Sequence, residues 1–174
     1  MIKTVGVVGA GTMGNGIAQV FAQSGFDVRV YDAAPGAVDR ARATIERSLS
    51  KFVEKGKLAA AEKDATLSRL RAAASLDDFG DVDFVVEAVI EQLDVKHALL
   101  SRLDGILRPE VVLGSNTSSI SITRLGAATK RPDKVLGVHF MNPVPLMTLV
   151  ELIRGQATSD ETMRTAVDLC KALG

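Results

Sequence analysis

A glycine-rich stretch near the N-terminus constrains the fold of this chain more than any other feature. The sequence "VGVVGAGTMGNG" spaces three glycines as G-x-G-x-x-G, directly after an apolar run and at the start of a helical pattern. In that context the first glycine permits a tight turn, the second lets the backbone approach a pyrophosphate, and the third lets the helix pack on the strand. The stretch predicts a strand–turn–helix unit whose helix N-terminus binds dinucleotide phosphates. The predicted binding residues are Gly9, Ala10, Gly11, Thr12, Met13 and Gly14.

The acid that follows the next apolar run indicates which dinucleotide is bound. That run, Asp27–Tyr31, is followed by Asp32, 18 residues after Gly14. A carboxylate there accepts hydrogen bonds from both hydroxyls of an adenosine ribose and repels a 2′-phosphate. The next residues, "AAPG", contain no arginine that could hold such a phosphate. The sequence therefore favours NAD over NADP as the cofactor.

Short apolar runs alternate with longer helical patterns along the whole chain, and this alternation predicts an α/β fold with a parallel sheet. The runs are nearly continuous in apolar residues, as strands buried on both faces are. We expect strands at Thr4–Val8, Asp27–Tyr31, Asp83–Ala88, Val111–Ser115 and Lys134–Phe140, and a weak strand near Leu70–Ala74. We expect helices at Gly14–Ser24, Ala37–Lys55, Ala59–Ala72, Leu93–Leu107, Ser119–Ala127 and Asp160–Leu173. The fold class is a Rossmann-type, doubly wound, mostly parallel sheet.

Two segments depart from simple alternation. The region between Asp32 and Asp83 is too long for one crossover helix, so we expect a two-helix insertion in which Gly56 ends the first helix. The apolar run Thr148–Ile153 follows Lys134–Phe140 across the short link "MNPVPLM". That link cannot hold a helical crossover, so this last strand is expected to pair antiparallel.

Composition narrows the range of partners. Twenty-one basic residues balance 21 acidic ones, and a net charge of zero argues against nucleic acid. No apolar run reaches the ~20 residues of a membrane span. The N-terminus enters a strand at once, without a secretory or transit segment, and the single cysteine, Cys170, suits a reducing compartment. We expect one domain over residues 1–174, a cytoplasmic location, no metal and no membrane or nucleic-acid partner.

Two ionisable residues lie where the apolar pattern indicates core. His139 lies within "VLGVHF", and Glu151 follows twelve residues later in the next run. Taken alone, both are explained as hydrogen-bonded structural polar groups. The alternative is a general base with an orienting acid, because imidazole titrates near working pH and a carboxylate on the far ring nitrogen fixes its tautomer. Adjacent strand ends would bring the two to one site.

Four stretches make the chain resemble the NAD-binding domain of 3-hydroxyacyl-CoA dehydrogenases. They are "VVGAGTMGNGIAQVFAQSG", "VVEAVIEQLDVK", "SNTSSISIT" and "GVHFMNPVPLMTLVELI", which occur in the family's order and span nearly the whole chain. The resemblance implies reversible oxidation of an (S)-3-hydroxyacyl-CoA, such as 3-hydroxybutyryl-CoA, to the 3-oxoacyl-CoA, with a hydride passing to NAD.

The resemblance also implies residue roles. It makes His139 the general base, Glu151 the residue that orients its ring, and Ser118 the group that hydrogen-bonds the reacting oxygen beside the nicotinamide. Further implied cofactor contacts are Glu91, Lys96, Asn116, Ser118 and Asn142, and implied coenzyme A contacts are Ser48, Lys55 and Ser118. From the residues alone, Ser48 and Lys55 could equally belong to a solvated helix face.

The family has a second, helical domain that forms most of its dimer interface. The sequence stops at Gly174, where the first domain of the family ends. We therefore expect a homodimer of the full-length protein through the absent C-terminal domain, and this chain alone is expected to lack activity. Two other functions stay open: a related dehydrogenase of free hydroxy acids, which usually uses a catalytic lysine, and an NAD-binding sensor or structural module without catalysis.

Overall fold

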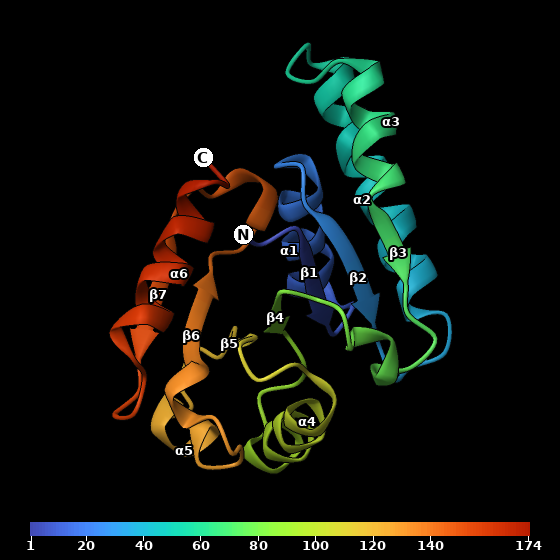
Figure 1. Ribbon diagram of the computed structural model, residues 1–174. Helices are drawn as coiled ribbons and strands as arrows, with labels where there is room; N and C mark the ends of the chain where they lie inside the picture. Colours follow the sequence, from blue (N-terminus) through green and yellow to red (C-terminus); the bar gives the residue numbers. More distant parts are fainter.

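A seven-stranded sheet forms the centre of the molecule, and the computed structural model describes all residues from 1 to 174 (Figure 1). The strands are β1 (Thr4–Val8), β2 (Asp27–Tyr31), β3 (Leu70–Ala72), β4 (Phe84–Glu87), β5 (Val112–Ser115), β6 (Val135–Phe140) and β7 (Val150–Arg154). Their order is β3-β2-β1-β4-β5-β6-β7, and only the β6–β7 pair is antiparallel. The predicted Rossmann-type fold and the antiparallel last strand are therefore confirmed.

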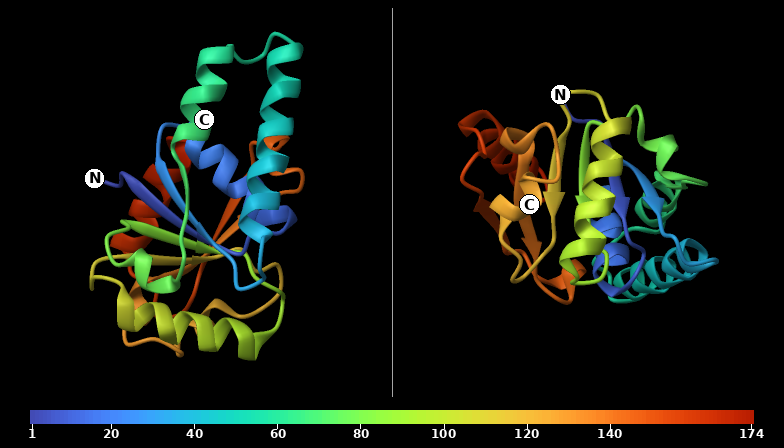
Figure 2. Two further views of the ribbon diagram at one scale, coloured as in Figure 1. Left: turned by 90° about the vertical axis from the view of Figure 1, so that its right-hand side faces the viewer. Right: turned by 90° about the horizontal axis from the view of Figure 1, so that it is seen from below.

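Helices cover both faces of this sheet (Figure 2). They are α1 (Thr12–Gln23), α2 (Ala37–Glu54), α3 (Ala60–Ser68), α4 (Leu93–Ile106), α5 (Ile122–Gly126) and α6 (Asp160–Lys171), with short 3-10 helices η1 (Leu76–Phe79), η2 (Pro132–Lys134) and η3 (Val144–Leu146). Helices α1, α2 and α6 contribute to one hydrophobic cluster, and α4 and α5 to another. Val7 of β1 belongs to the first cluster and Val8 to the second, which explains why the strands are apolar throughout. No helix is long and apolar enough to cross a membrane.

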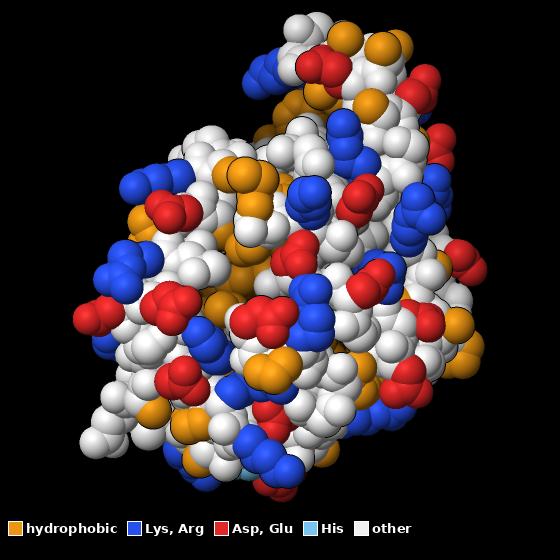
Figure 3. Space-filling view, in the orientation of Figure 1, with side chains coloured by type: hydrophobic (Ala, Val, Ile, Leu, Met, Phe, Trp, Pro, Cys, Tyr) orange, Lys and Arg blue, Asp and Glu red, His pale blue; other side chains and the backbone are white.

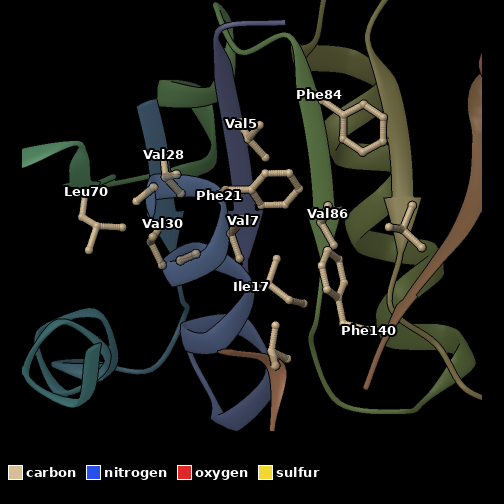
Figure 4. Packing of buried hydrophobic residues seen from close by; sticks show 14 of the residues in the cluster. Val5, Val7, Ile17, Phe21, Val28, Val30, Leu70, Phe84, Val86 and Phe140 are labelled. Carbon is tan, nitrogen blue, oxygen red and sulfur yellow. The ribbon is translucent and has the colours of Figure 1, made fainter. Parts of the chain in front are cut away.

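Helix α1 is packed on the sheet by large apolar side chains (Figure 4). Ile17 and Phe21 are fully buried in the cluster that contains Val5 and Val7 of β1. The Phe21 ring meets the Phe140 ring edge-on, with centroids 6.0 Å apart. Burial of each such side chain contributes roughly 1.5–3 kcal/mol. This packing holds the N-terminus of α1 at the carboxyl end of β1, where the glycine turn lies.

Helices α2 and α3 form the expected two-helix insertion, which projects beyond the sheet (Figures 1 and 2). Gly56 follows α2 with a φ of +66°, as expected for the residue that ends this helix. Three apolar residues of α2 at helical spacing, Ala41, Ile45 and Leu49, are buried against the body of the domain. Their burial on one side of α2 leaves polar residues of the same helix free to line a cleft.

Two helix predictions were too long. Helix α3 ends at Ser68 and not at Ala72, because Leu70 is buried and pairs with Val28 as part of β3. The helix expected from Ser119 begins at Ile122, because side-chain oxygens bind the backbone N–H groups before it. These long-range contacts override local helical propensity. The remaining predicted elements agree with the structure to within two residues at each end.

Candidate active site

The glycine turn has the geometry that a dinucleotide phosphate requires. Gly9 has a φ of +100°, and a Cβ on Gly14 would collide with the carbonyl oxygen of Gly9. Gly11 caps α1, and a Cβ there would meet no atom of the chain within 4 Å. The open side of Gly11 thus leaves room for a phosphate beside the unpaired N–H groups of the helix N-terminus. The residues present fit a bound dinucleotide.

Asp32 is positioned by backbone N–H groups on both of its carboxylate oxygens. Oδ2 accepts from Ala10 N at 2.7 Å and Oδ1 accepts from Ala34 N at 2.8 Å. The half-buried carboxylate is therefore held at the end of β2, directly beside the glycine turn. This is the position from which an acid contacts the ribose of a bound dinucleotide.

Arg40 lies against the loop that follows Asp32, and its place could not be seen from the sequence. Its Nη1 donates to the carbonyl oxygen of Pro35 at 3.3 Å, so the guanidinium lies against the loop that follows Asp32. The stretch "AAPG" contains no arginine, but Arg40 in the first turn of α2 contacts the carbonyl oxygen of Pro35 within it. The predicted preference for NAD over NADP therefore depends on the charge of Asp32 and no longer on the absence of a local cation.

His139 and Glu151 are directly opposite each other in the antiparallel β6–β7 pair. Nδ1 of His139 lies 2.8 Å from Oε2 of Glu151. A carboxylate only accepts, so the contact assigns the hydrogen to Nδ1 and leaves a lone pair on Nε2. Nε2 makes no hydrogen bond within the chain. The expected contact between the two side chains is present, with the geometry of a base and its orienting acid.

This pair is not part of the core. The side chain of His139 is 23% exposed and that of Glu151 is 53% exposed. Glu151 is exposed because β7 is the edge strand and no further strand covers it. The pair is therefore accessible from solvent, and its role as base and orienting acid stays a prediction.

The loop after β5 lies beside this pair. Oδ1 of Asn116 accepts from Phe140 N at 2.9 Å, which ties the loop to the residue after His139. Ser118 is exposed, and its hydroxyl makes no hydrogen bond within the chain. The Asn116 oxygen is thus occupied by backbone, whereas the Ser118 hydroxyl is free to meet a ligand.

Lys96 does not reach the surface on which a cofactor would lie. Its side chain is 1% exposed, and Nζ lies 2.8 Å from Oε1 and Oε2 of Glu87, which is fully buried. Nζ also lies 3.4 Å from Oε2 of Glu91. The buried ammonium is held by these carboxylates, and its implied contact with the cofactor stays a prediction.

Glu91, by contrast, is 39% exposed at this edge of the sheet. Burial alone would raise its pKa, but hydrogen bonds from the loop residues Thr117, Ser118 and Ser119 and the charge of Lys96 lower the pKa below its ordinary value. The ionised carboxylate is therefore the favoured form at neutral pH. Its implied contact with the cofactor stays a prediction.

A cleft of about 470 Å³ lies between α2 and the turn at η3. It brings together four residues predicted to bind ligands: Thr12, Ser48, Lys55 and Asn142. The cleft is also lined by Lys51 and Lys57, and no carboxylate lines it. Acidic and basic side chains are otherwise interspersed over the face seen in Figure 3. The cleft is therefore a local basic site on a chain of zero net charge.

Gly16 and Lys57 are cleft residues whose roles sequence reasoning missed. A Cβ on Gly16 would lie 2.7 Å from Cβ of Val144, so only glycine lets η3 approach α1 this closely. Lys57 follows the helix break at Gly56 and turns back to the cleft. The final glycine of "GTMGNG" was the available signal for Gly16, but nothing local showed where Lys57 would lie.

Two further titratable residues lie outside the site. His97 is half-buried, and its Nε2 lies 2.8 Å from the carbonyl oxygen of Arg124 in α5. Burial raises the pKa of the Cys170 thiol to about 11, which disfavours the reactive thiolate. Neither side chain lies in the cleft or beside the His139–Glu151 pair.

Comparison with known proteins gives concordant matches. The sequence profile described as "3-hydroxyacyl-CoA dehydrogenase, NAD binding domain" matches residues 4–174. A 3-hydroxybutyryl-CoA dehydrogenase of Bradyrhizobium diazoefficiens is 49% identical over 174 residues, which are 100% of this chain and 59% of that protein. The crystal structure of (S)-3-hydroxybutyryl-CoA dehydrogenase from Ralstonia eutropha matches with a TM-score of 0.98 and 49% identity, over 100% of this chain and 62% of that one.

The same domain also matches within a much longer protein. The fatty acid oxidation complex subunit alpha of a Psychrobacter species is 41% identical over 173 residues, which are 99% of this chain and 24% of that protein. The chain thus spans about three fifths of the length of the Bradyrhizobium and Ralstonia relatives and a quarter of the Psychrobacter one.

Proposed function

The chain belongs to the 3-hydroxyacyl-CoA dehydrogenase family as its NAD-binding domain, and from this premise we propose that the whole protein interconverts (S)-3-hydroxyacyl-CoA and 3-oxoacyl-CoA with NAD. The relatives named 3-hydroxybutyryl-CoA dehydrogenase favour a short acyl chain. The observation that carries the proposal is the 2.8 Å contact between His139 Nδ1 and Glu151 Oε2. It presents an oriented imidazole at the edge of the sheet that also carries the glycine turn.

Three side chains have separate roles in the proposed reaction. Bound NAD supplies the hydride acceptor. Nε2 of His139 takes the hydroxyl proton of the substrate as the hydride leaves, and returns it in the reverse direction. Glu151 accepts the Nδ1 hydrogen, which fixes the tautomer and stabilises the imidazolium. The free hydroxyl of Ser118 hydrogen-bonds the reacting oxygen.

The basic cleft supports binding of the coenzyme A portion of the substrate. Ser48 and Lys55 line it together with Lys51 and Lys57, and none of these lysines forms an ion pair within the chain. Unpaired ammonium groups without a neighbouring carboxylate favour phosphate. In the complete protein, Lys55→Ala should raise KM for acetoacetyl-CoA and leave NADH affinity unchanged. Lys130→Ala, an exposed lysine outside the cleft, is the matched control.

An apolar surface supports the presence of a further domain. Leu146, Met147 and Leu149 are exposed beside a groove of about 420 Å³ that α6 also lines. We propose that a C-terminal helical domain of the whole protein packs here and forms a homodimer in the cytoplasm. Sedimentation of the complete protein and of residues 1–174 tests this, because only the complete protein should dimerise.

The direct test is the reduction of a series of 3-oxoacyl-CoAs by the complete protein. The loss of NADH absorbance measures the rate for each substrate. Acetoacetyl-CoA should be among the preferred substrates, and NADPH should be a poorer reductant than NADH. Binding of NADH without turnover of any 3-oxoacyl-CoA would support a sensor or structural module. Preference for a free 3-oxo acid over its coenzyme A ester would support a related hydroxy-acid dehydrogenase.

A further inference from the structure

The cleft between α2 and η3 contains an aromatic side chain that the hydrophobic core does not explain. Phe52 is half-buried and lines this cleft. The other five phenylalanines and Tyr31 lie in or against the two hydrophobic clusters, whereas Phe52 belongs to neither cluster. Phe52 also forms no ring pair with another aromatic side chain. Its exposed surface is therefore available to an occupant of the cleft.

The ring lies among polar and positively charged groups of the same helix face. Ser48, Phe52 and Lys55 follow one another at four and three residues, so their side chains form one row along α2 and its C-cap. Lys51 and Lys57 line the same cleft, and no carboxylate does. The cleft thus combines an aromatic surface with ammonium groups that no acidic side chain of the cleft neutralises.

This combination suits an aromatic base that carries phosphates. Ammonium groups without an opposing carboxylate favour phosphate. A flat base stacks on an aromatic side chain whatever its identity, because every base has a π-face. An apolar occupant would instead leave the ammonium groups desolvated and without a counter-charge. In coenzyme A an adenine ring and phosphates lie on one ribose, so a single ligand matches both features of the cleft.

The position predicted for the adenosine of NAD lies elsewhere. Asp32, the predicted ribose contact, does not line the cleft. The cleft extends instead from the end of α2 to Asn142, three residues after His139. A ligand with its nucleotide beside Phe52 can therefore extend toward the end of β6 that carries the imidazole.

We propose that Phe52 stacks on the adenine ring of the coenzyme A portion of the substrate. The inference rests on the proposed function, in which Ser48 and Lys55 bind the same portion, and it adds a contact with the base to the contacts with phosphate. Phe52 is therefore a specificity residue, which distinguishes a coenzyme A ester from a thioester that lacks the nucleotide. It acts on substrate affinity and not on the hydride transfer.

Binding of coenzyme A to the complete protein, measured by calorimetry, tests the stacking without any turnover. Phe52→Ala should weaken this binding roughly 5–100-fold, the range for loss of one base–aromatic stack, and should leave NADH affinity unchanged. Phe52→Trp should retain the binding. Phe52→Leu should lose most of it, because leucine is apolar but has no aromatic face. Val53→Ala is the matched control, because Val53 is a half-buried neighbour on α2 that does not line the cleft.

Kinetics with two thioesters separate contact with the base from a general effect on the cleft. With Phe52→Ala in the complete protein, KM for acetoacetyl-CoA should rise by about the same factor as the binding constant, at unchanged kcat. Turnover of acetoacetyl-pantetheine, which has no adenine, should be the same in both proteins. An equal loss with both thioesters would mean that Phe52 maintains the shape of the cleft, and would overturn the proposal.

Two binding results would also overturn it. They are unchanged affinity of Phe52→Ala for coenzyme A, and full affinity of Phe52→Leu. Absence of acyl-CoA turnover in the unmodified protein, with coenzyme A still bound through Phe52, would overturn only the proposed function.

Discussion

Two acid–base pairs at the carboxyl edge of the sheet have the same contact distance and opposite surroundings. His139 and Glu151 are 2.8 Å apart on the edge strand β7 and its neighbour β6, with 23% and 53% of their side chains exposed. Lys96 and Glu87 are also 2.8 Å apart, but beside the central strand, with 1% and 0% exposed. Distance alone therefore does not distinguish a reactive pair from a structural one.

Burial decides what each pair can do. A buried ion pair has lost its hydration, so removal of one partner leaves an uncompensated charge, and the pair cannot exchange protons with a ligand. The exposed pair contributes little to stability, because water screens it, but its free Nε2 is accessible. We therefore expect substitutions in the exposed pair to change rate, and substitutions in the buried pair to change stability.

The largest effect should come from the exposed pair. His139→Ala in the complete protein should reduce kcat for acetoacetyl-CoA by about 10²–10⁴-fold, the range for loss of a general base. NADH affinity and the thermal midpoint should stay close to those of the unmodified protein. The measurements are steady-state kinetics, cofactor fluorescence and thermal melting. A lower thermal midpoint with unchanged kcat would mean that His139 contributes to stability and not to the rate, which would contradict the proposal.

A second substitution tests whether Glu151 acts on the reaction through the imidazole of His139. Glu151→Gln should also reduce kcat, since an amide neither stabilises the imidazolium nor enforces one tautomer. Residues that work as a unit are not additive, so the double variant should resemble His139→Ala alone. Losses that multiply in the double variant would mean that the two residues act independently.

The buried pair should show the converse pattern. Lys96→Met removes the buried counter-charge of Glu87, which keeps only its hydrogen bonds from Ser115 and Val89, at a cost of about 3–5 kcal/mol in the free energy of unfolding. The double variant Glu87→Gln with Lys96→Met should recover much of this loss, because both charges are gone. Urea unfolding of the three proteins measures the difference. Equal stability of the single variant and the unmodified protein would show that this pair is not a buried ion pair.

A substitution at Asp32 tests the predicted contact with the adenosine ribose of the cofactor. Asp32→Ala removes two ribose contacts made by a charged acceptor, so NADH binding should weaken by roughly 10–100-fold. NADPH binding should change little or improve, because a repulsive charge is lost beside Arg40. Fluorescence titration with NADH and with NADPH gives the ratio of the two affinities in each protein. A parallel loss for the two cofactors would contradict the assigned ribose contact.

The smallest effect should come from a pair of intermediate exposure, Asp83 and Arg108, whose side chains are 26% and 44% exposed. Burial alone would raise the pKa of Asp83, but backbone N–H groups of Thr4 and Lys3 and the guanidinium of Arg108 lower it. The folded pKa lies below the unfolded one, so the stabilisation is present above pH ~3.9 and is lost as pH falls through the folded value.

Asp83→Asn should therefore lower the thermal midpoint by roughly 2–4 °C at neutral pH and by less near pH 3. Thermal melting across this pH range measures the change, with Asp64→Asn as a control, because Asp64 is exposed and makes no contact of this kind. A constant difference at all pH values would mean that the charge of Asp83 does not contribute.

Features that depend on short stretches of chain were predictable from the sequence. The glycine turn follows from steric limits within six residues, and β1 and β2 have the predicted bounds because their apolar runs are continuous. The short link between Phe140 and Val150 excludes a crossover, and the resulting hairpin brings His139 opposite Glu151. Each of these outcomes is set by local geometry and by the need to bury apolar side chains.

Only the tertiary structure decided the surroundings of the charged residues. Nothing local to Lys96 showed that Glu87 would bury its ammonium, or that Glu91 would accept hydrogen bonds from a loop 27 residues further along the chain. Arg40 reaches the Asp32 loop, and Lys57 reaches the cleft, through the fold of α2 and its end. Burial and hydrogen-bond partners arise from contacts between distant segments, and the desolvation of a charge is a property of that assembled environment.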